Sequence, residues 1–195
     1  DAFGISCAAL ESNYGWDCSG CACPGDVAGD DGGGLFSYTT SSAQHITIDS
    51  SNISGNIANG FAYGGGIYSY ANGECNLDLY NSTINGNTAL YNGGGVCVVS
   101  PNDTISVTNS TVNNNTAEIN GGGIASYGTL SAIILTNSIV NYNTANTDNG
   151  GGIFLYNSSG FNFLKLVNSD LTYNNAANDG GGAYLYSNIS NSTDS

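Results

Sequence analysis

A triplet of consecutive glycines recurs at nearly constant intervals along most of this 195-residue chain. The triplets begin at Gly32, Gly64, Gly93, Gly121, Gly150 and Gly180, so the repeat is about 30 residues long. A fixed period of this size is typical of proteins built from stacked structural units that cannot bury their apolar faces alone. We therefore expect a solenoid.

The residues after each triplet indicate which kind of unit repeats. Small or aliphatic residues alternate with mostly aromatic ones, and a period of two predicts a short strand. Further apolar segments follow in each repeat, while Gly, Asn and Ser interrupt the chain every few residues and no segment has a helical period. We expect about three strands per repeat and no helix. Because equivalent residues recur in register, the predicted fold is an all-β, right-handed parallel β-helix of about five to six rungs.

Equivalent residues of a parallel β-helix lie above one another, so recurring asparagines become ladders in which the amides bond one another and the turn backbone. The first predicted ladder contains Asn81, Asn109, Asn137 and Asn168, with Ser50 in the first repeat. The second contains Asn56, Asn87, Asn115, Asn143 and Asn174.

A column of aromatic residues is also expected, on the outer face of the first strand. Its members are Tyr38, Tyr70, Tyr127, Tyr156 and Tyr186, with Val99 at one level. Stacked tyrosines stabilise neighbouring strands, and an exposed aromatic stripe can also bind carbohydrate or a second protomer. Stabilisation of the stack is the first expectation, and the outer Tyr face is a possible binding surface.

The repeats resemble those of the chlamydial polymorphic outer-membrane protein family. The likeness rests on the triplet followed by Ile, Val or Ala, and on segments such as Ile-Ser-Gly-Asn at 53–56 and Ile-Asn-Gly-Asn at 84–87, over roughly residues 32–183. These segments correspond to the GGA(I/L/V) and FxxN motifs of that family. The resemblance implies a parallel β-helix and an adhesive role at a cell surface. Two differences are a Gly in place of the family's Ala at the third triplet position and an aliphatic residue in place of Phe.

Residues 1–31 differ in composition from the repeats and contain four of the six cysteines, Cys7, Cys18, Cys21 and Cys23. We expect a cap module over residues 1–31, stapled by disulfides, and a solenoid over residues 32–195. The C-x2-C-x-C spacing would also suit zinc. In the repeats, Cys75 and Cys97 are predicted to form a disulfide between rungs.

Eight Asn-X-Ser/Thr sequons point to a secreted or cell-surface glycoprotein, since N-glycosylation and disulfides both belong to the secretory route. Asn81 and Asn109 are set aside because they belong to a predicted ladder. The predicted N-glycan sites are Asn52, Asn102, Asn114, Asn157, Asn188 and Asn191. The start at Asp1 is expected for a matured or truncated secreted product.

The charge composition excludes several classes of partner. One Lys, no Arg and fifteen acidic residues give a net charge of −14, so nothing is available to neutralise phosphates, and neither nucleic acid nor an anionic membrane is an expected partner. The chain contains no stretch of 18 apolar residues, so no membrane-spanning helix is predicted.

Catalytic residues are not evident. Polysaccharide lyases need a cationic base, and the chain offers only Lys165 and His45. Glycoside hydrolysis needs two facing carboxylates, whereas Asp49 and Asp78 lie at different strand positions. We therefore expect no enzyme activity and no cofactor. A weak calcium candidate is the turn with Asp26, Asp30 and Asp31, for which a solvated acidic turn is the alternative.

The repeat that starts at Gly180 is incomplete and carries no cysteine or charged block. An open last rung is a surface for head-to-tail pairing, and such a contact does not close into a ring when it repeats by translation. The leading hypothesis is a structural subunit of an extracellular filament or coat that pairs with itself. The alternatives are an adhesin or carbohydrate-binding module that uses the Tyr face, and a chain that continues past Ser195.

Overall fold

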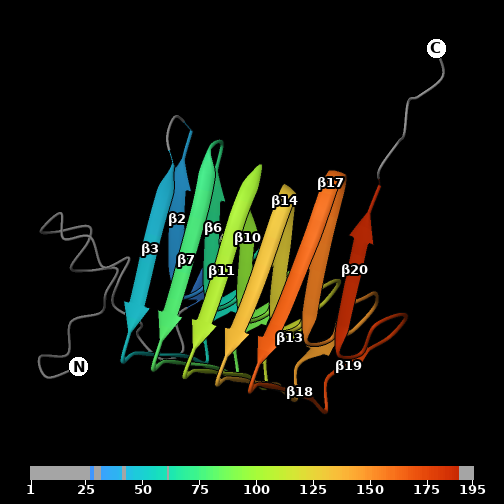
Figure 1. Ribbon diagram of the computed structural model, residues 1–195. Helices are drawn as coiled ribbons and strands as arrows, with labels where there is room; N and C mark the ends of the chain where they lie inside the picture. Colours follow the sequence, from blue (N-terminus) through green and yellow to red (C-terminus); the bar gives the residue numbers. More distant parts are fainter. Residues whose placement is uncertain (1–26, 29–31, 41–42, 61, 189–195) are drawn as a thin grey trace, which may run out of the picture.

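The computed structural model describes residues 27–28, 32–40, 43–60 and 62–188, and this part of the chain contains strands and no helix. The strands coil into a parallel β-helix of five complete turns, and β20 (Ala183–Ser187) begins a sixth (Figure 1). The predicted fold class is thereby confirmed. Each turn contains four strand segments, whereas about three were predicted.

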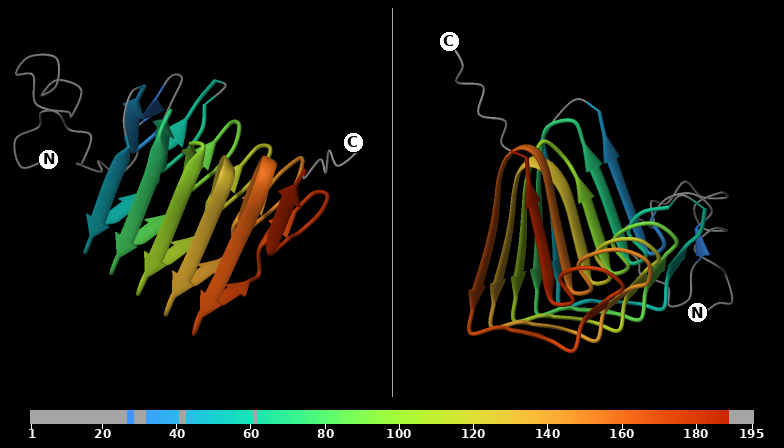
Figure 2. Two further views of the ribbon diagram at one scale, coloured as in Figure 1. Left: turned by 45° about the horizontal axis from the view of Figure 1, so that its top comes forward. Right: turned by 90° about the vertical axis from the view of Figure 1, so that its right-hand side faces the viewer.

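The first two segments of each turn are long and face each other as two walls of the solenoid (Figure 2, right). In the first three turns they are β2 (Leu35–Thr39) and β3 (Gln44–Asp49), β6 (Ile67–Ala71) and β7 (Glu74–Tyr80), and β10 (Val96–Val99) and β11 (Asn102–Thr108). In the fourth and fifth turns one continuous strand supplies both walls, β14 (Ile124–Thr136) and β17 (Ile153–Val167). We call these the first wall and the second wall.

Two short segments close each turn. The third segments are β4 (Asn52–Ser54), β8 (Thr83–Asn85), β12 (Thr111–Asn113), β15 (Ile139–Asn141) and β18 (Asp170–Thr172). The fourth are β5 (Ile57–Ala58), β9 (Thr88–Ala89), β13 (Thr116–Ala117), β16 (Thr144–Ala145) and β19 (Asn175–Ala176). β1 (Val27–Ala28) belongs to the predicted cap of residues 1–31, yet it pairs with β5 of the first turn. The sheet therefore begins before the predicted boundary at residue 32. The remaining residues of the predicted cap, 1–26 and 29–31, lie outside the described part.

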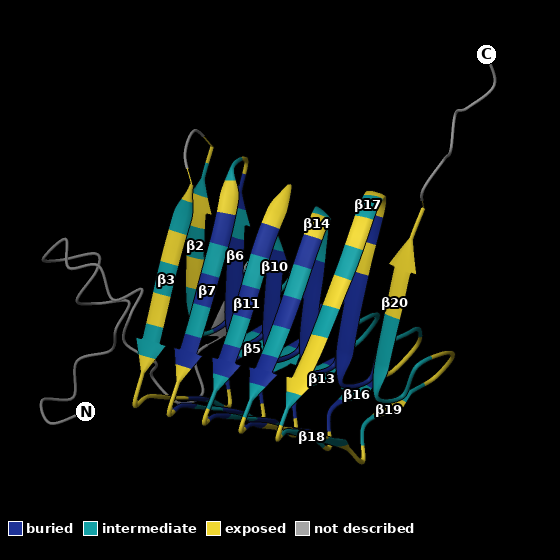
Figure 3. Cartoon of the chain, in the orientation of Figure 1, coloured by how far each residue is buried: buried dark blue, intermediate teal, exposed yellow. Residues whose placement is uncertain are grey.

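Equivalent residues pair in parallel register from turn to turn, as the repeat predicts. Ile67, Val96, Ile124 and Ile153 form one such column, and all four are fully buried. Inward residues of the second wall and of the third segments complete the core, including Leu79, Val107, Leu135, Ile84 and Val140. Figure 3 shows the buried positions continuing from β7 through β11 and β14.

The glycine triplet has a separate steric reason at each position, illustrated by the fourth turn. Gly121 has φ of 66°, a left-handed conformation that only glycine adopts without strain. A Cβ on Gly122 would lie 2.4 Å from the carbonyl oxygen of Thr144, and a Cβ on Gly123 would lie 2.5 Å from that of Gly152. The third position therefore has no room for the alanine found in the family that the repeats resemble.

The outer face of the first wall is not simply exposed, contrary to the expectation of an outward aromatic face. Tyr68, Cys97, Ala125 and Phe154 point outward and are buried in a second apolar cluster. Tyr63, in the loop that leads to a glycine triplet, packs against this cluster. The second to fifth turns therefore have a main core between their walls and a smaller core outside the first wall.

Candidate functional site

The second predicted asparagine ladder is present and buried. Asn143 illustrates its geometry: its Nδ2 donates to Asn174 Oδ1 and to the carbonyl oxygen of Val112, each at 2.9 Å. Its Oδ1 accepts from both the backbone N–H and Nδ2 of Asn115, each at 3.0 Å. The amide is fully satisfied although Asn143 is 0% exposed. This column holds neighbouring turns together inside the solenoid.

The first predicted ladder is exposed and weaker. Asn137 Nδ2 donates to Asn109 Oδ1 at 3.3 Å, and Asn168 Nδ2 donates to Asn137 Oδ1 at 3.4 Å. All members have left-handed backbones, with φ between 48° and 50°. Asn is the residue that tolerates this conformation best after Gly, so the backbone turn is the main reason for this column.

A serine ladder beside it was missed by the sequence reasoning. Ser82, Ser110 and Ser138 directly follow the exposed asparagines and are buried. Each Oγ accepts a backbone N–H of the preceding turn, for example Ser110 N–H to Ser138 Oγ at 3.1 Å, and donates to a carbonyl two residues back. The recurrent Asn-Ser pair was the available signal.

The tyrosine column exists in the predicted register but its rings mostly cover one another. The ring centroids of Tyr38 and Tyr70 are 5.1 Å apart with planes at 17°, and those of Tyr156 and Tyr186 are 5.3 Å apart at 7°. Stacked rings present edges and hydroxyls to solvent, whereas a sugar ring packs on a ring face. Burial also raises the pKa of the Tyr127 hydroxyl well above its ordinary value. The column therefore stabilises the stack more than it offers a platform.

The predicted glycan sites differ in exposure. Asn52, Asn102, Asn114 and Asn188 are exposed, and Asn191 lies outside the described residues. Asn157 is 0% exposed, which contradicts its prediction as a glycan site. Its Oδ1 accepts from the backbone of Ser159 and Gly160 at 2.9 and 2.7 Å, and its Nδ2 donates to the carbonyl of Thr129, because the amide caps an irregular turn within β17.

Asn81 and Asn109 were set aside as ladder residues, yet both are exposed. Asn109 Nδ2 donates to Asn81 Oδ1 at 3.4 Å and Asn81 Nδ2 donates to Asp49 Oδ1 at 3.0 Å, and a glycan linkage replaces only one of the two hydrogens on each nitrogen. Burial therefore does not distinguish these two sequons from the predicted ones.

The predicted disulfide between Cys75 and Cys97 is not formed, and both are free, buried thiols. Cys75 points into the main core from the second wall, while Cys97 points away from it into the second cluster. The prediction was wrong because Cys75 lies within a strand of the second wall and Cys97 on the first wall, and their side chains point into different clusters. Burial raises the pKa of both thiols. Cys7, Cys18, Cys21 and Cys23 lie outside the described residues.

Among the described residues one carboxyl is buried, and the sequence reasoning missed it. Asp103 is 3% exposed, and its Oδ2 accepts from Ser126 Oγ at 2.7 Å, across the core from the first wall. Its Oδ1 has no partner among the described residues. Burial raises the pKa of Asp103 to about 6. Inward position in the strand was the only available signal.

The remaining ionisable candidates do not form a site of facing acids. His45 Nε2 lies 3.0 Å from Asp78 Oδ2 on the outer face of the second wall, and the His45 side chain is 61% exposed. Among the described residues no cluster of three or more His, Cys, Asp or Glu could hold a metal ion. The calcium candidates Asp26, Asp30 and Asp31 lie outside them.

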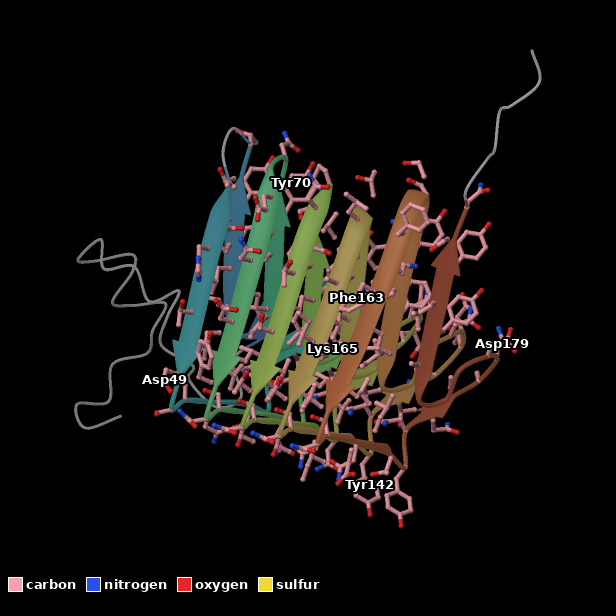
Figure 4. The ribbon with its side chains drawn as sticks, in the orientation of Figure 1. Asp49, Tyr70, Tyr142, Phe163, Lys165 and Asp179 are labelled. Atoms are coloured by element: carbon pink, nitrogen blue, oxygen red, sulfur yellow. The ribbon has the colours of Figure 1, made fainter. Side chains whose placement is uncertain are left out.

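The second wall has an exposed apolar patch that the sequence reasoning missed. Leu130, Phe161 and Phe163 are 52%, 67% and 53% exposed on the outer face of β14 and β17. Figure 4 shows Phe163 beside Lys165 on β17. We refer to these three side chains as the outer apolar patch.

Comparisons of the chain with protein-family models, curated proteins and solved structures found no match. The resemblance to the chlamydial family therefore stays a prediction. No helix in the described ranges has the length and apolarity to span a membrane.

Proposed function

We propose that this protein is a non-catalytic structural subunit of an extracellular, N-glycosylated filament or surface coat, assembled head to tail through the ends of its β-helix. The observation that carries the proposal is the apolar end face of the last described turns. Leu166 and Leu185 occupy inward positions there, yet they are 41% and 45% exposed because no described turn covers them.

The opposite end offers a surface of similar character. Leu35, Ile46 and Ile48 of the first described turn are only partly buried and line an opening of about 630 Å³. Turns pair in constant parallel register, so a first turn placed on a last turn continues the pattern of β2, β3 and β4, while the edge of β5 is already paired with β1. Such a contact joins two different surfaces, and repetition produces a filament.

The composition agrees with a structural role. The charge of −14 opposes binding to nucleic acid or anionic membranes, and the exposed sequons suit a secreted or cell-surface glycoprotein without a cofactor. Self-association through the apolar positions of the two end turns is then the expected partnership.

Sedimentation velocity and negative-stain imaging of Leu185→Asp test this proposal, with Leu130→Asp as the matched control on the outer apolar patch. The unmodified protein and the control should form rods whose length rises with concentration, whereas Leu185→Asp should remain monomeric because it places a charge on the end face. A monomeric unmodified protein at all concentrations would contradict the proposal. So would disassembly caused by the control alone.

A second candidate, carbohydrate binding, is favoured by one groove of about 310 Å³. Tyr184 and Tyr186 line it together with Asp148 and Asn149, a combination of aromatic and hydrogen-bonding groups. Tyr186 is the last described ring of its stack, so one of its faces is not covered by another ring of the column. Loss of glycan-array signal in Tyr186→Ala but not in Tyr38→Ala would support this function, and equal signals would exclude it.

A further inference from the structure

The outer face of the second wall changes from polar to apolar along the solenoid. One column of paired residues runs from Glu74 through Asn102 to Leu130 and Phe161. A neighbouring column runs from Asn76 through Thr104 to Ala132 and Phe163. The polar residues belong to the second and third turns, and the outer apolar patch belongs to the fourth and fifth.

A sequon lies directly at the edge of this patch. Asn102 and Thr104, its first and third residues, both face outward, while Asp103 between them points inward. They line a shallow hollow of about 460 Å³ together with Leu130, Phe161 and Phe163. Asn102 is exposed, and within the described ranges its side-chain amide makes no hydrogen bond, while its backbone carbonyl accepts from Ser100 Oγ at 3.0 Å.

We propose that an N-glycan on Asn102 folds back over the outer apolar patch, with its first sugars lying on Leu130 and Phe161. This inference rests on the proposed function, because it requires a glycosylated protein. Neighbouring strands are about 4.8 Å apart, so Leu130 lies one spacing and Phe161 two spacings, roughly 10 Å, from the attachment point. The rigid first two sugars of an N-glycan extend over this range.

The chemistry of the patch suits a glycan. The rings of the first sugars have apolar C–H faces and polar edges, while Leu130 and the two phenylalanines are bordered by the polar side chains of Glu74 and Lys165. A covalent tether at the edge of the patch also gives the glycan a high effective concentration there.

The size of the patch argues against a protein partner. Three partly exposed side chains of this kind offer no more than roughly 500 Å², whereas a stable protein interface buries about 800 Å² on each partner. An uncovered patch of this kind is an aggregation liability, which a glycan would remove.

The test compares Thr104→Ala, which removes the Asn102 sequon, with Ser54→Ala, which removes the Asn52 sequon far from the patch. Each variant is made in a glycosylating host, with and without Phe161→Ala and Phe163→Ala, and Asn102 occupancy is read by glycopeptide mass spectrometry. Binding of the dye ANS should rise in Thr104→Ala but not in Ser54→Ala. The rise should disappear when both phenylalanines are replaced. Material from a host without glycosylation controls for the lost threonine, since Thr104→Ala should have no effect there.

Three results would overturn the inference. An occupied Asn102 with unchanged ANS binding on its removal would mean that the glycan extends into solvent, and the proposed glycoprotein would stand. An unoccupied Asn102 would remove both the inference and the glycan proposed at this site. Association of Thr104→Ala into dimers that Phe161→Ala prevents, with no glycan dependence, would assign the patch to a second copy of the chain.

Discussion

Replacement of a buried ladder asparagine tests whether the amide columns hold the solenoid together. Asn143→Ala and Asn137→Ala change the same residue type within one turn, and neither position belongs to a sequon. Asn143 is 0% exposed, while Asn137 is exposed. The two variants therefore separate the buried ladder from the exposed one.

The magnitude follows from the bonds that each change removes. Without the Asn143 side chain, the backbone N–H of Asn115 and one N–H of the Asn115 amide lose their acceptor in the core. At about 1–3 kcal/mol for each of these two unsatisfied buried groups, we expect a loss of about 2–6 kcal/mol of unfolding free energy. Asn137→Ala loses two long exposed bonds and places alanine at φ of 50°, which costs about 1 kcal/mol.

Equilibrium urea unfolding followed by far-ultraviolet circular dichroism measures both losses. Because both positions are in the fourth turn, they report on the same contacts between neighbouring turns. A loss for Asn143→Ala no larger than for Asn137→Ala would refute the assignment of the buried column as the main link between turns. Asn137→Gly serves as a further control and should be nearly neutral, since glycine adopts the left-handed backbone freely.

Three other changes give distinct outcomes. The pKa of Asp103 is about 6 in the folded protein against an ordinary 3.8, so between these pH values the folded state keeps a proton that the unfolded state releases. The stabilisation from this proton is fully present below pH 3.8, and about 3 kcal/mol of unfolding free energy is lost as the pH rises through 6. Urea midpoints measured between about pH 4 and 7.5 should show this decrease in the unmodified protein, and Asp103→Asn should remove it. Gly123→Ala places a Cβ 2.5 Å from a carbonyl oxygen. It should lower the unfolding midpoint more than Gly86→Ala, whose Cβ meets nothing within 4 Å and whose cost of about 1 kcal/mol comes only from its φ of 65°. Equal shifts would contradict the steric account of the triplet. Cys75 and Cys97 should resist iodoacetamide in the native protein and react after unfolding without reductant, and failure to react then would indicate a disulfide.

The features that the sequence predicted correctly are those that depend only on the position of a residue within its repeat. The parallel register, the inward aliphatic columns and the buried ladder around Asn115 follow from in-register pairing, which places equivalent residues above one another whatever the loops do. The residues that were misjudged are those whose surroundings come from another part of the turn. Cys97 is buried by a loop packed outside the first wall, and Asp103 lies across the core from Ser126.

The periodic sequence by itself determined the stack: six glycine triplets and two asparagine columns are compatible with parallel turns in register and with little else. Only the tertiary structure decided what each outward position meets. Asn157 follows Ile153 and Leu155 on the inward face of β17 and is buried, and the register shift after its pairing with Gly128 brings Phe161 beside Leu130, so an apolar patch forms near Asn102. The physical reason is that backbone pairing depends on spacing along the chain, whereas exposure depends on which loop or wall packs against each face.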